Sequence, residues 1–489
     1  MTGTHSSRRF VRGAYPGRLA VVFPLVVAIA ALSVATAHGQ EFSEKREIAV
    51  FRLNYYGAPR DPVPSSETVV QLGKVFRFER IVQAETTEIF KQAVGAIDEK
   101  IRSVFIDLGR FDVIGMSMRL NHENVDAFMQ ALRDYRAEDL ELPETVLFGE
   151  EAFTRADFNR LVGGFIVVVP SVSFYDLNRE EDDEGRVAYD ATIETSFTFI
   201  DSDTLSTEGQ FFIETNGYDE DPEEAMREAV DAIPRQLSFE IRKMDLFRLR
   251  TGVLAVDGRT VTIEFGRNMG VRRGDEYAIV RTVESVAGRS FEEESGLLVV
   301  EEVRPDFSVA HLIYADDRPR IGDQLEEVPR FGIETTPYGG GIIDATGELS
   351  NFLVGVRAVA SRGFFTTRPL VGLEIPIRQA GSGLFPLNLY AGGELNWYLG
   401  RLKLAPGIGG GVGGGIPLHP DSGDQFYVTH LGGHVRASIM YAVSRDIYAF
   451  LDGGYAAWVG LAADTVPSSV RPYFDGYYGI LISAGIVLK

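Results

Sequence analysis

The feature that most constrains the fold is an alternation of apolar and polar side chains through the last third of the chain. In "FPLNLYAGGELNWYLG" the leucines and Trp397 share one phase, whereas Asn388, Tyr390, Glu394 and Asn396 share the other. Because successive side chains of a β-strand point to opposite faces, this pattern predicts strands with one apolar and one polar face. Similar segments recur to the end of the sequence, for example "VRASIMYAV" and "YGILISAGIVLK".

Alternating segments fill the chain beyond Pro337. There are about eight of them, each of roughly ten residues or more, which is typical of the smallest transmembrane β-barrels. We therefore expect residues 336–489 to form an eight-stranded antiparallel transmembrane β-barrel. A soluble antiparallel β-sandwich alternates in the same way and is the alternative.

A glycine-rich stretch, "LAPGIGGGVGGGIP", lies on one of these segments between Leu404 and Pro417. It contains the G-x-G-x-x-G spelling of dinucleotide-binding loops, but the prolines and turn residues that follow it do not allow the helix that such a loop needs. Glycine in a barrel strand lets the strand coil and leaves space for larger neighbours such as Tyr390 or Tyr448. The stretch therefore predicts part of a barrel wall.

Ionisable residues in the alternating region fall on the phase opposite to the apolar one. In a narrow barrel, side chains on this phase point inward, where they usually form an internal ion-pair plug. A more specific alternative is that these residues form a path for protons or ions. The expected barrel-interior ionisable residues are Arg357, Glu374, Glu394, Arg436 and Asp452.

The first residues have the pattern of a secretory signal. Residues 1–39 combine a basic start, an apolar run from Leu19 to Val34 and small residues before a candidate cleavage site. The sequence has no cysteine, so we expect an exported protein that is not acylated at an N-terminal cysteine. Outer-membrane barrels usually end in an aromatic residue, whereas this sequence ends in Lys489.

Residues 45–247 mix strand and helix patterns, which predicts an α/β (α+β) domain. Apolar strands are expected at "EIAVFRL", "RFDVIGM" and "GGFIVVVPSVSFYDL", and a hairpin around Asp201 to Gly209. Apolar residues at helical spacing predict one helix over residues 84–105 and a second around Phe128. A third helix should begin at "DEDPEEAM" with a capping box, and Pro234 should kink or split it.

This order of elements resembles the curli-secretion-channel family and the related amino-terminal domain of the Tol translocation protein B. The matching stretches are "EIAVFRL", "RFDVIGM" and "FIDSDTLSTEGQ", the last of which is similar to a turn of that family. The resemblance implies a periplasmic domain, and by analogy with the curli channel it implies that the domain could form a ring.

Residues 250–329 change to short strands separated by glycine turns, which predicts a small, SH3-like β-barrel. The run "V-D-G-x-x-V-x-I-x-x-G-x-x-x-G-V-x-x-G-D" resembles the carboxy-terminal domain of a flagellar outer-membrane-ring assembly protein. That resemblance implies a second periplasmic module beside a Tol-like domain.

The sequence shows no pattern of catalytic, cofactor-binding or metal-binding residues, so we expect a non-enzymatic protein without a cofactor. The seven histidines have no metal-ligand spacing. The formal net charge of −22 argues against nucleic acid as a partner, because nucleic-acid binding depends on Lys and Arg.

Together these patterns predict a multidomain protein anchored in the outer membrane, with its N-terminal domains in the periplasm. The expected partners are outer-membrane lipid and periplasmic proteins. The expected function is that of an adaptor or assembly scaffold in secretion, envelope or flagellar-ring biogenesis. An oligomeric export pore related to curli secretion is one alternative, with the chain as a homo-oligomer. A soluble periplasmic binding factor with a C-terminal β-sandwich is the other.

Overall fold

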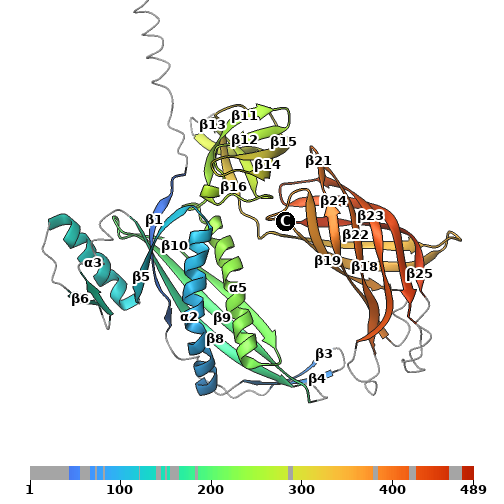
Figure 1. Ribbon diagram of the computed structural model, residues 1–489, viewed down its shortest axis with the longest axis horizontal. Helices are drawn as coiled ribbons and strands as arrows, with labels where there is room; N and C mark the ends of the chain where they lie inside the picture. The colour runs from blue at the N-terminus through green and yellow to red at the C-terminus, as the bar shows by residue number, and fades with distance from the viewer. Residues whose placement is uncertain are drawn as a thin grey trace, which may run out of the picture. The chain divides into compact units, whose positions relative to one another are not determined.

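The structure is a computed structural model, shown in Figure 1. The expected signal segment, residues 1–39, lies outside the described residues, and Ser43 to Lys489 form one unit. The described residues are 43–55, 67–71, 74–80, 83–120, 122–138, 145–148, 151–154, 165–181, 185–284, 290–377, 384–417, 426–461 and 476–489.

The first part of the chain forms a mixed sheet with helices on both faces. The sheet order is β10-β9-β8-β1-β5, in which β1 runs parallel to β5 and β8, and β8, β9 and β10 are antiparallel. Its elements are β1 (Arg46–Arg52), β2 (Asn54–Tyr55), β3 (Glu67–Gln71), β4 (Lys74–Arg80), α2 (Gln83–Asp107), β5 (Phe111–Arg119), α3 (His122–Glu138), β6 (Thr145–Phe148), β7 (Glu151–Thr154), β8 (Ile166–Glu181), β9 (Val187–Asp201), β10 (Thr207–Asp219) and α5 (Pro222–Lys243).

Strand β1 supplies side chains to two separate cores. Ile48 and Val50 pack with the apolar faces of α2 and α5, whereas Ala49 and Phe51 pack with α3 on the opposite face of the sheet. Helices α2 and α5 lie side by side on their face (Figure 1). In the described part of the chain, no helix is both long enough and apolar enough to cross a membrane.

Helix α5 begins at the expected residue but differs from the sequence prediction in two respects. The Asp221 carboxylate accepts hydrogen bonds from the N–H groups of Glu223 and Glu224. The Asp221 N–H donates to the side chain of Asp219 at 2.9 Å, so this contact takes the place of the capping box predicted from Glu224. The helix continues through Pro234 without a break, because its buried apolar face is anchored to the sheet on both sides of the proline.

Strands β3 and β4 correct the sequence analysis, which assigns no element between the first strand and the first helix. They form a hairpin, and Arg77 to Arg80 of β4 pair with the end of β8. The short β6–β7 hairpin is also absent from the predicted elements.

The second part of the chain is a closed barrel with strand order β11-β12-β15-β14-β13-β16. Its interior is filled by apolar side chains, including Val261, Tyr277, Ile279, Leu298 and Leu325. Its elements are β11 (Arg250–Asp257), β12 (Thr260–Ile263), the 3-10 helix η1 (Arg267–Met269), β13 (Glu276–Glu284), β14 (Ser290–Val303), β15 (Ser308–Ala315) and β16 (Gln324–Val328). We call this part the six-stranded module.

The third part is a closed antiparallel barrel of eight strands, with the short β21 paired to one edge of β22. Strand β17 pairs with β25, and β20 pairs with β22, so the sheet closes on itself. The sandwich alternative is therefore wrong. The strands are β17 (Ile333–Ile343), β18 (Leu349–Ala360), β19 (Thr367–Pro376), β20 (Leu384–Leu395), β21 (Trp397–Leu399), β22 (Leu402–Pro417), β23 (Tyr427–Ala442), β24 (Ile447–Gly460) and β25 (Tyr477–Leu488).

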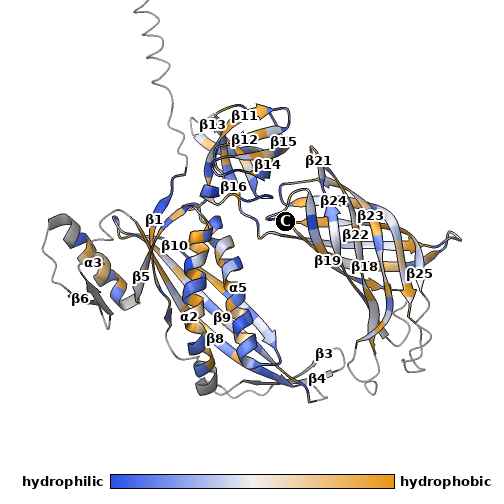
Figure 2. Cartoon of the chain, viewed as in Figure 1, coloured by the Kyte–Doolittle hydropathy of each residue, from blue (hydrophilic) through white to orange (hydrophobic). Residues whose placement is uncertain are grey.

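The eight-stranded barrel has an apolar outer face, and its interior holds charged and polar side chains together with aromatic and aliphatic ones. Figure 2 shows hydrophilic and hydrophobic residues alternating along its strands. Along β23, Val435, Ile439 and Tyr441 are exposed, whereas Arg436 and Ser438 between them are buried. A water-soluble barrel has the opposite arrangement, since its apolar side chains fill the interior.

Candidate functional site: the barrel interior and the charged junction

All five ionisable residues expected inside the barrel are buried there, none more than 3% exposed. They come from five strands, and each lies on the inward phase of its strand. They are Arg357 on β18, Glu374 on β19, Glu394 on β20, Arg436 on β23 and Asp452 on β24.

Four of these residues belong to one group, in which Arg357, Glu374 and Arg436 contact aromatic side chains. Arg357 forms an ion pair with Asp452 at 2.9 Å between Nη1 and Oδ2, and the Ser483 hydroxyl also donates to that carboxylate. The Arg357 guanidinium lies 4.7 Å from the centre of the Phe450 ring. Glu374 accepts a hydrogen bond from the hydroxyl of Tyr338, so its partner is a phenol rather than an arginine.

Tyr390 lies at the centre of this group. Its hydroxyl is 2.9 Å from the Tyr338 hydroxyl, and the Arg436 guanidinium lies 5.7 Å from its ring centre. Two glycines make room for the ring: a Cβ at Gly372 would collide with it, and a Cβ at Gly409 would lie 2.9 Å from its Cδ2 atom. Gly409 belongs to the glycine-rich stretch, which therefore accommodates Tyr390 in the barrel interior.

Glu394 lies apart from the other four and belongs to a second charged group that the sequence analysis misses. Arg368 forms an ion pair with Glu334 at 2.8 Å and lies 4.0 Å from Glu394, and Lys403 lies 3.8 Å from Glu334. Arg368 on β19 and Lys403 on β22 lie on the inward-facing phase of their strands, so the alternation in the sequence could have identified them as interior residues. The described interior thus holds two clusters of charged side chains, each with at least one ion pair, and closely packed rings.

A further buried cluster joins the α/β region to the six-stranded module. Glu327 on β16 accepts from Arg110, which precedes β5, at 2.7 Å, and from Arg242 on α5 at 2.6 Å. Arg242 also reaches Asp275 at 3.3 Å. Burial alone would raise the pKa of Glu327, but the two guanidinium groups hold it well below its ordinary value.

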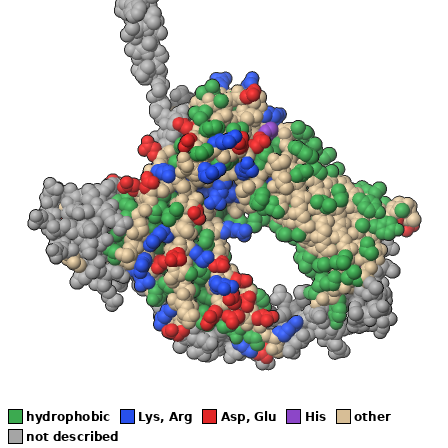
Figure 3. Space-filling model, in the orientation of Figure 1, with side chains coloured by type: hydrophobic (Ala, Val, Ile, Leu, Met, Phe, Trp, Pro, Cys, Tyr) green, Lys and Arg blue, Asp and Glu red, His purple; other side chains and the backbone are tan. Residues whose placement is uncertain are grey.

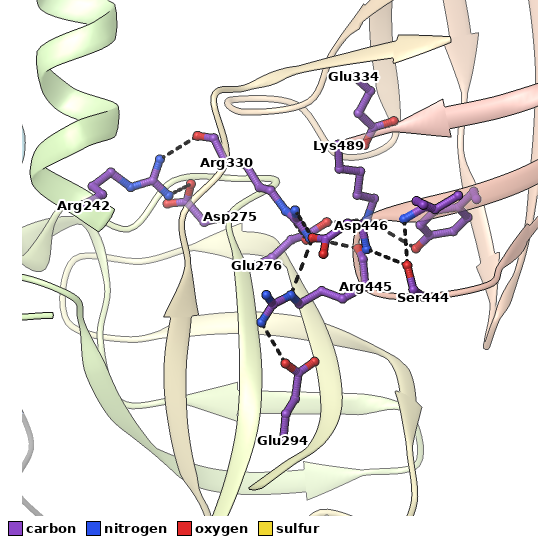
Figure 4. Close-up of polar contacts among 12 residues, drawn as sticks. Arg242, Asp275, Glu276, Glu294, Arg330, Glu334, Ser444, Arg445, Asp446 and Lys489 are labelled. Atoms are coloured by element: carbon purple, nitrogen blue, oxygen red, sulfur yellow. Dashed lines mark hydrogen bonds and ion pairs between the residues drawn. The ribbon is translucent and has the colours of Figure 1, made fainter. Parts of the chain in front are cut away.

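Asp275 and Glu276 continue the charged cluster from the module to the eight-stranded barrel (Figure 4). Asp275 accepts from Arg362, in the β18–β19 connection, at 2.9 Å. Glu276 accepts from Arg330 at 2.8 Å and from Lys489. Burial would raise the pKa of Glu276, and the charges of Lys489 and Arg330 lower it instead.

Two glycines of the motif "GVRRGD" allow the backbones to approach at these contacts. Gly270 has a φ of 78° and a Cβ there would collide with the carbonyl oxygen of Leu108 at the end of α2. Gly274 also has a φ of 78°, and its Cβ would collide with the carbonyl oxygen of Ser361 in the β18–β19 connection. The module therefore contacts the α/β region and the barrel through backbone positions that favour glycine.

The junction is the main feature that sequence reasoning misses. Its charged residues come from the turn before β5, from α5, from the module, from the linker after β16, from two barrel turns and from the end of β25, so no local pattern links them. Among the described residues, no group of three or more His, Cys, Asp or Glu side chains is arranged to hold a metal ion.

Comparisons with known proteins add little to this geometry. No family model matches the chain, and no curated protein matches it. Among the solved structures that match is OmpF of Salmonella typhi in complex with daunomycin, which is 9% identical and covers 64% of this chain and 89% of that chain, with a TM-score of 0.16. A superposition with that score says nothing about fold or function.

Proposed function

We propose that strands β17 to β25 span an outer membrane and that the α/β region and the six-stranded module are held on its periplasmic side. There they serve as an adaptor or assembly scaffold for periplasmic protein partners. The observation that carries this proposal is the inverted polarity of the eight-stranded barrel, with charges inside and apolar side chains outside.

The outer face of the barrel supports membrane insertion. Figure 3 shows this surface as mainly hydrophobic and uncharged atoms, with very few charged side chains. Soluble monomers rarely expose so wide an apolar surface, whereas barrels in lipid need one. Large apolar residues that are at least 50% exposed include Phe352, Val354, Val371, Ile408, Val435, Ile439, Leu451, Val459 and Ile480.

The lengths of the strand connections support the periplasmic placement of the module. On the side of the barrel that meets the module, residues 361–366 join β18 to β19, and residues 443–446 join β23 to β24. At the other end, residues 344–348 join β17 to β18, residues 377–383 join β19 to β20, residues 418–426 join β22 to β23, and residues 461–476 join β24 to β25, so three of these four connections are longer than both of the former. Outer-membrane barrels have short turns on the periplasmic side and longer loops outside.

The junction supports the scaffold role. The buried ion pairs of Glu327, Asp275 and Glu276 connect the α/β region, the module and the barrel in series. Such pairs depend strongly on geometry, because an unpaired buried charge is costly. A scaffold that presents binding surfaces in fixed positions next to a membrane needs connections of this kind.

The relationship to the curli-secretion-channel family and to the flagellar-ring assembly module is part of the same proposal. The order of strands and helices from β1 to α5 and the compact barrel from β11 to β16 support it. Partner proteins isolated by crosslinking in the periplasm would test it, since the proposal requires secretion, envelope or flagellar-ring components among them.

Membrane insertion is tested by two matched variants. Val435→Arg places a charge on the outer face of the barrel near the middle of β23, where it should lower stability by about 2–4 kcal/mol in a bilayer. Leu254→Arg changes a similarly exposed residue of the module, 46% against 58%, and should have little effect. Migration on a denaturing gel before and after boiling reports the folded barrel. Equal effects of the two variants, or extraction of the mature protein from envelopes without detergent, would contradict the proposal.

A further inference from the structure

A cavity of about 570 Å³ lies where α5, the linker after β16 and the ends of β18 and β19 meet. Phe239 and Phe331 form apolar parts of its wall, and Asp107 is its one acidic lining residue in the described part of the chain. Five arginines also line it: Arg235, Arg242, Arg272, Arg330 and Arg362. Figure 3 shows Lys and Arg side chains gathered on this face of the molecule, beside the six-stranded module.

Part of this positive charge has no matching acid. Arg235 lies 5.4 Å from the centre of the Phe331 ring, and neither its side chain nor that of Arg272 forms an ion pair with any described residue. Arg362 uses Nε to reach Asp275, while its Nη2 atom is buried without a hydrogen-bond partner among the described residues. The cavity therefore offers guanidinium groups to an anion.

An apolar groove of about 550 Å³ adjoins this cavity on the outer face of the barrel. The cavity and the groove share Ala358 on β18 and Val371 on β19 as lining residues. From there the groove extends across β20 to β22, where Gly410 and Gly411 of the glycine-rich stretch line it. The small residues leave a hollow on a surface that otherwise carries large apolar side chains.

We propose that the cavity and the groove together bind one anionic phospholipid. The headgroup phosphate lies among Arg235, Arg272 and Arg362, and an acyl chain extends past Val371 into the groove. Guanidinium groups match the geometry of phosphate oxygens, and basic residues at a membrane surface attract anionic lipids. This inference rests on the proposed function, because it places the groove in the lipid layer.

The test uses the full mature chain in detergent and measures lipid binding by native mass spectrometry. Dimyristoyl phosphatidylglycerol should bind in preference to dimyristoyl phosphatidylcholine, which has the same acyl chains but no net charge. The double variant Arg235→Gln/Arg272→Gln should weaken phosphatidylglycerol binding by roughly 30-fold, or about fivefold for each arginine. Arg227→Gln, an exposed position on the same helix α5, is the matched control and should leave binding unchanged.

A second variant tests the cavity without altering its charge. Ser238 lines the cavity, so Ser238→Trp should fill it and abolish the preference for phosphatidylglycerol. Equal binding of the two lipids, or wild-type binding by both variants, would overturn the inference. Displacement of phosphatidylglycerol by equimolar inorganic phosphate would also overturn it, because the acyl chain would then contribute nothing.

The two proposals fail in different ways. A mature protein that stays in solution without detergent would refute the membrane barrel. A protein that requires detergent and shows heat-modifiable migration, but does not distinguish the two lipids, would refute only the lipid site.

Discussion

Replacing Glu327 by glutamine should destabilise the junction far more than the same change at the neighbouring Glu326. The Glu327 carboxylate is fully buried and accepts hydrogen bonds from Arg110 and Arg242. Glutamine keeps the shape but removes the negative charge, which leaves two buried guanidinium groups without their main partner. Removing one member of a buried ion pair costs about 3–5 kcal/mol.

The effect can be measured as hydrogen exchange in the full chain. The N–H of Leu249 donates to Glu327 at 3.3 Å, so peptides that contain Leu249 report opening of the junction. A loss of about 3 kcal/mol in opening free energy should speed their exchange by roughly a hundred-fold or more.

Glu326→Gln is the matched control for this experiment. Its side chain is 16% exposed and pairs with Arg248 and Arg250 near the surface. Pairs of this kind are worth about 1 kcal/mol or less. Equal exchange rates in Glu326→Gln and Glu327→Gln would refute the conclusion that Glu327 holds the α/β region and the module together.

The difference should also depend on pH. The folded-state pKa of Glu327 is depressed, so its contribution is present above the unfolded value of about 4.3 and is lost as the pH falls through the folded value. Wild type should therefore approach Glu327→Gln in acid. A gap that widens below pH 4 would contradict this sign.

Three further predictions concern the junction and the barrel wall. Gly274→Ala should loosen the contact between the module and the barrel, which limited proteolysis would detect. Gly258 also has a positive φ but has open space around it, so Gly258→Ala should reduce the free energy of unfolding by only about 1 kcal/mol. Gly372→Ala should lower the temperature at which the barrel loses its folded migration on a gel, because Tyr390 occupies the space of the new Cβ. A Cβ at Gly453 would meet no atom within 4 Å, so Gly453→Ala should leave that temperature unchanged. The pKa of Glu276 is depressed, so the stability of the module–barrel contact in the wild type should fall as the pH drops below about 4. Glu276→Gln should lack this stability at neutral pH and should not lose more of it in acid. A variant with the acid profile of the wild type would contradict the assignment.

The sequence predicted the strand phases of the barrel well, and the reason is local. In a closed barrel every strand has one face in lipid and one face inside, so the two-residue period at Arg436 or Glu394 already determines which way the side chain points. The Arg357–Asp452 pair could not be predicted, because it depends on which strands become neighbours across the interior. Pro234 does not split α5, because packing of the helix on the sheet, which depends on distant residues, outweighs the local effect of the proline.

The charged junction could not be predicted from the sequence either, because it also depends on which distant segments become neighbours. Asp275 and Glu276 look like ordinary polar residues after a glycine turn, and their burial depends on partners from distant parts of the chain. The sequence shows the spacing of Gly270 and Gly274, but it does not show that the backbone of the α/β region approaches the first and the backbone of the barrel approaches the second.

The pairing of β17 with β25 sets an order of events during assembly. Thr335 pairs with Leu488, so the ring of strands closes only when the two ends of the barrel sequence meet. Contacts between such distant segments form late, because a long loop must be ordered first. Lys489 follows β25 directly and reaches Glu276 of the module. The strand that closes the ring is therefore also the strand whose end is tied to the module, so the Lys489–Glu276 contact couples the closing seam of the barrel to the module.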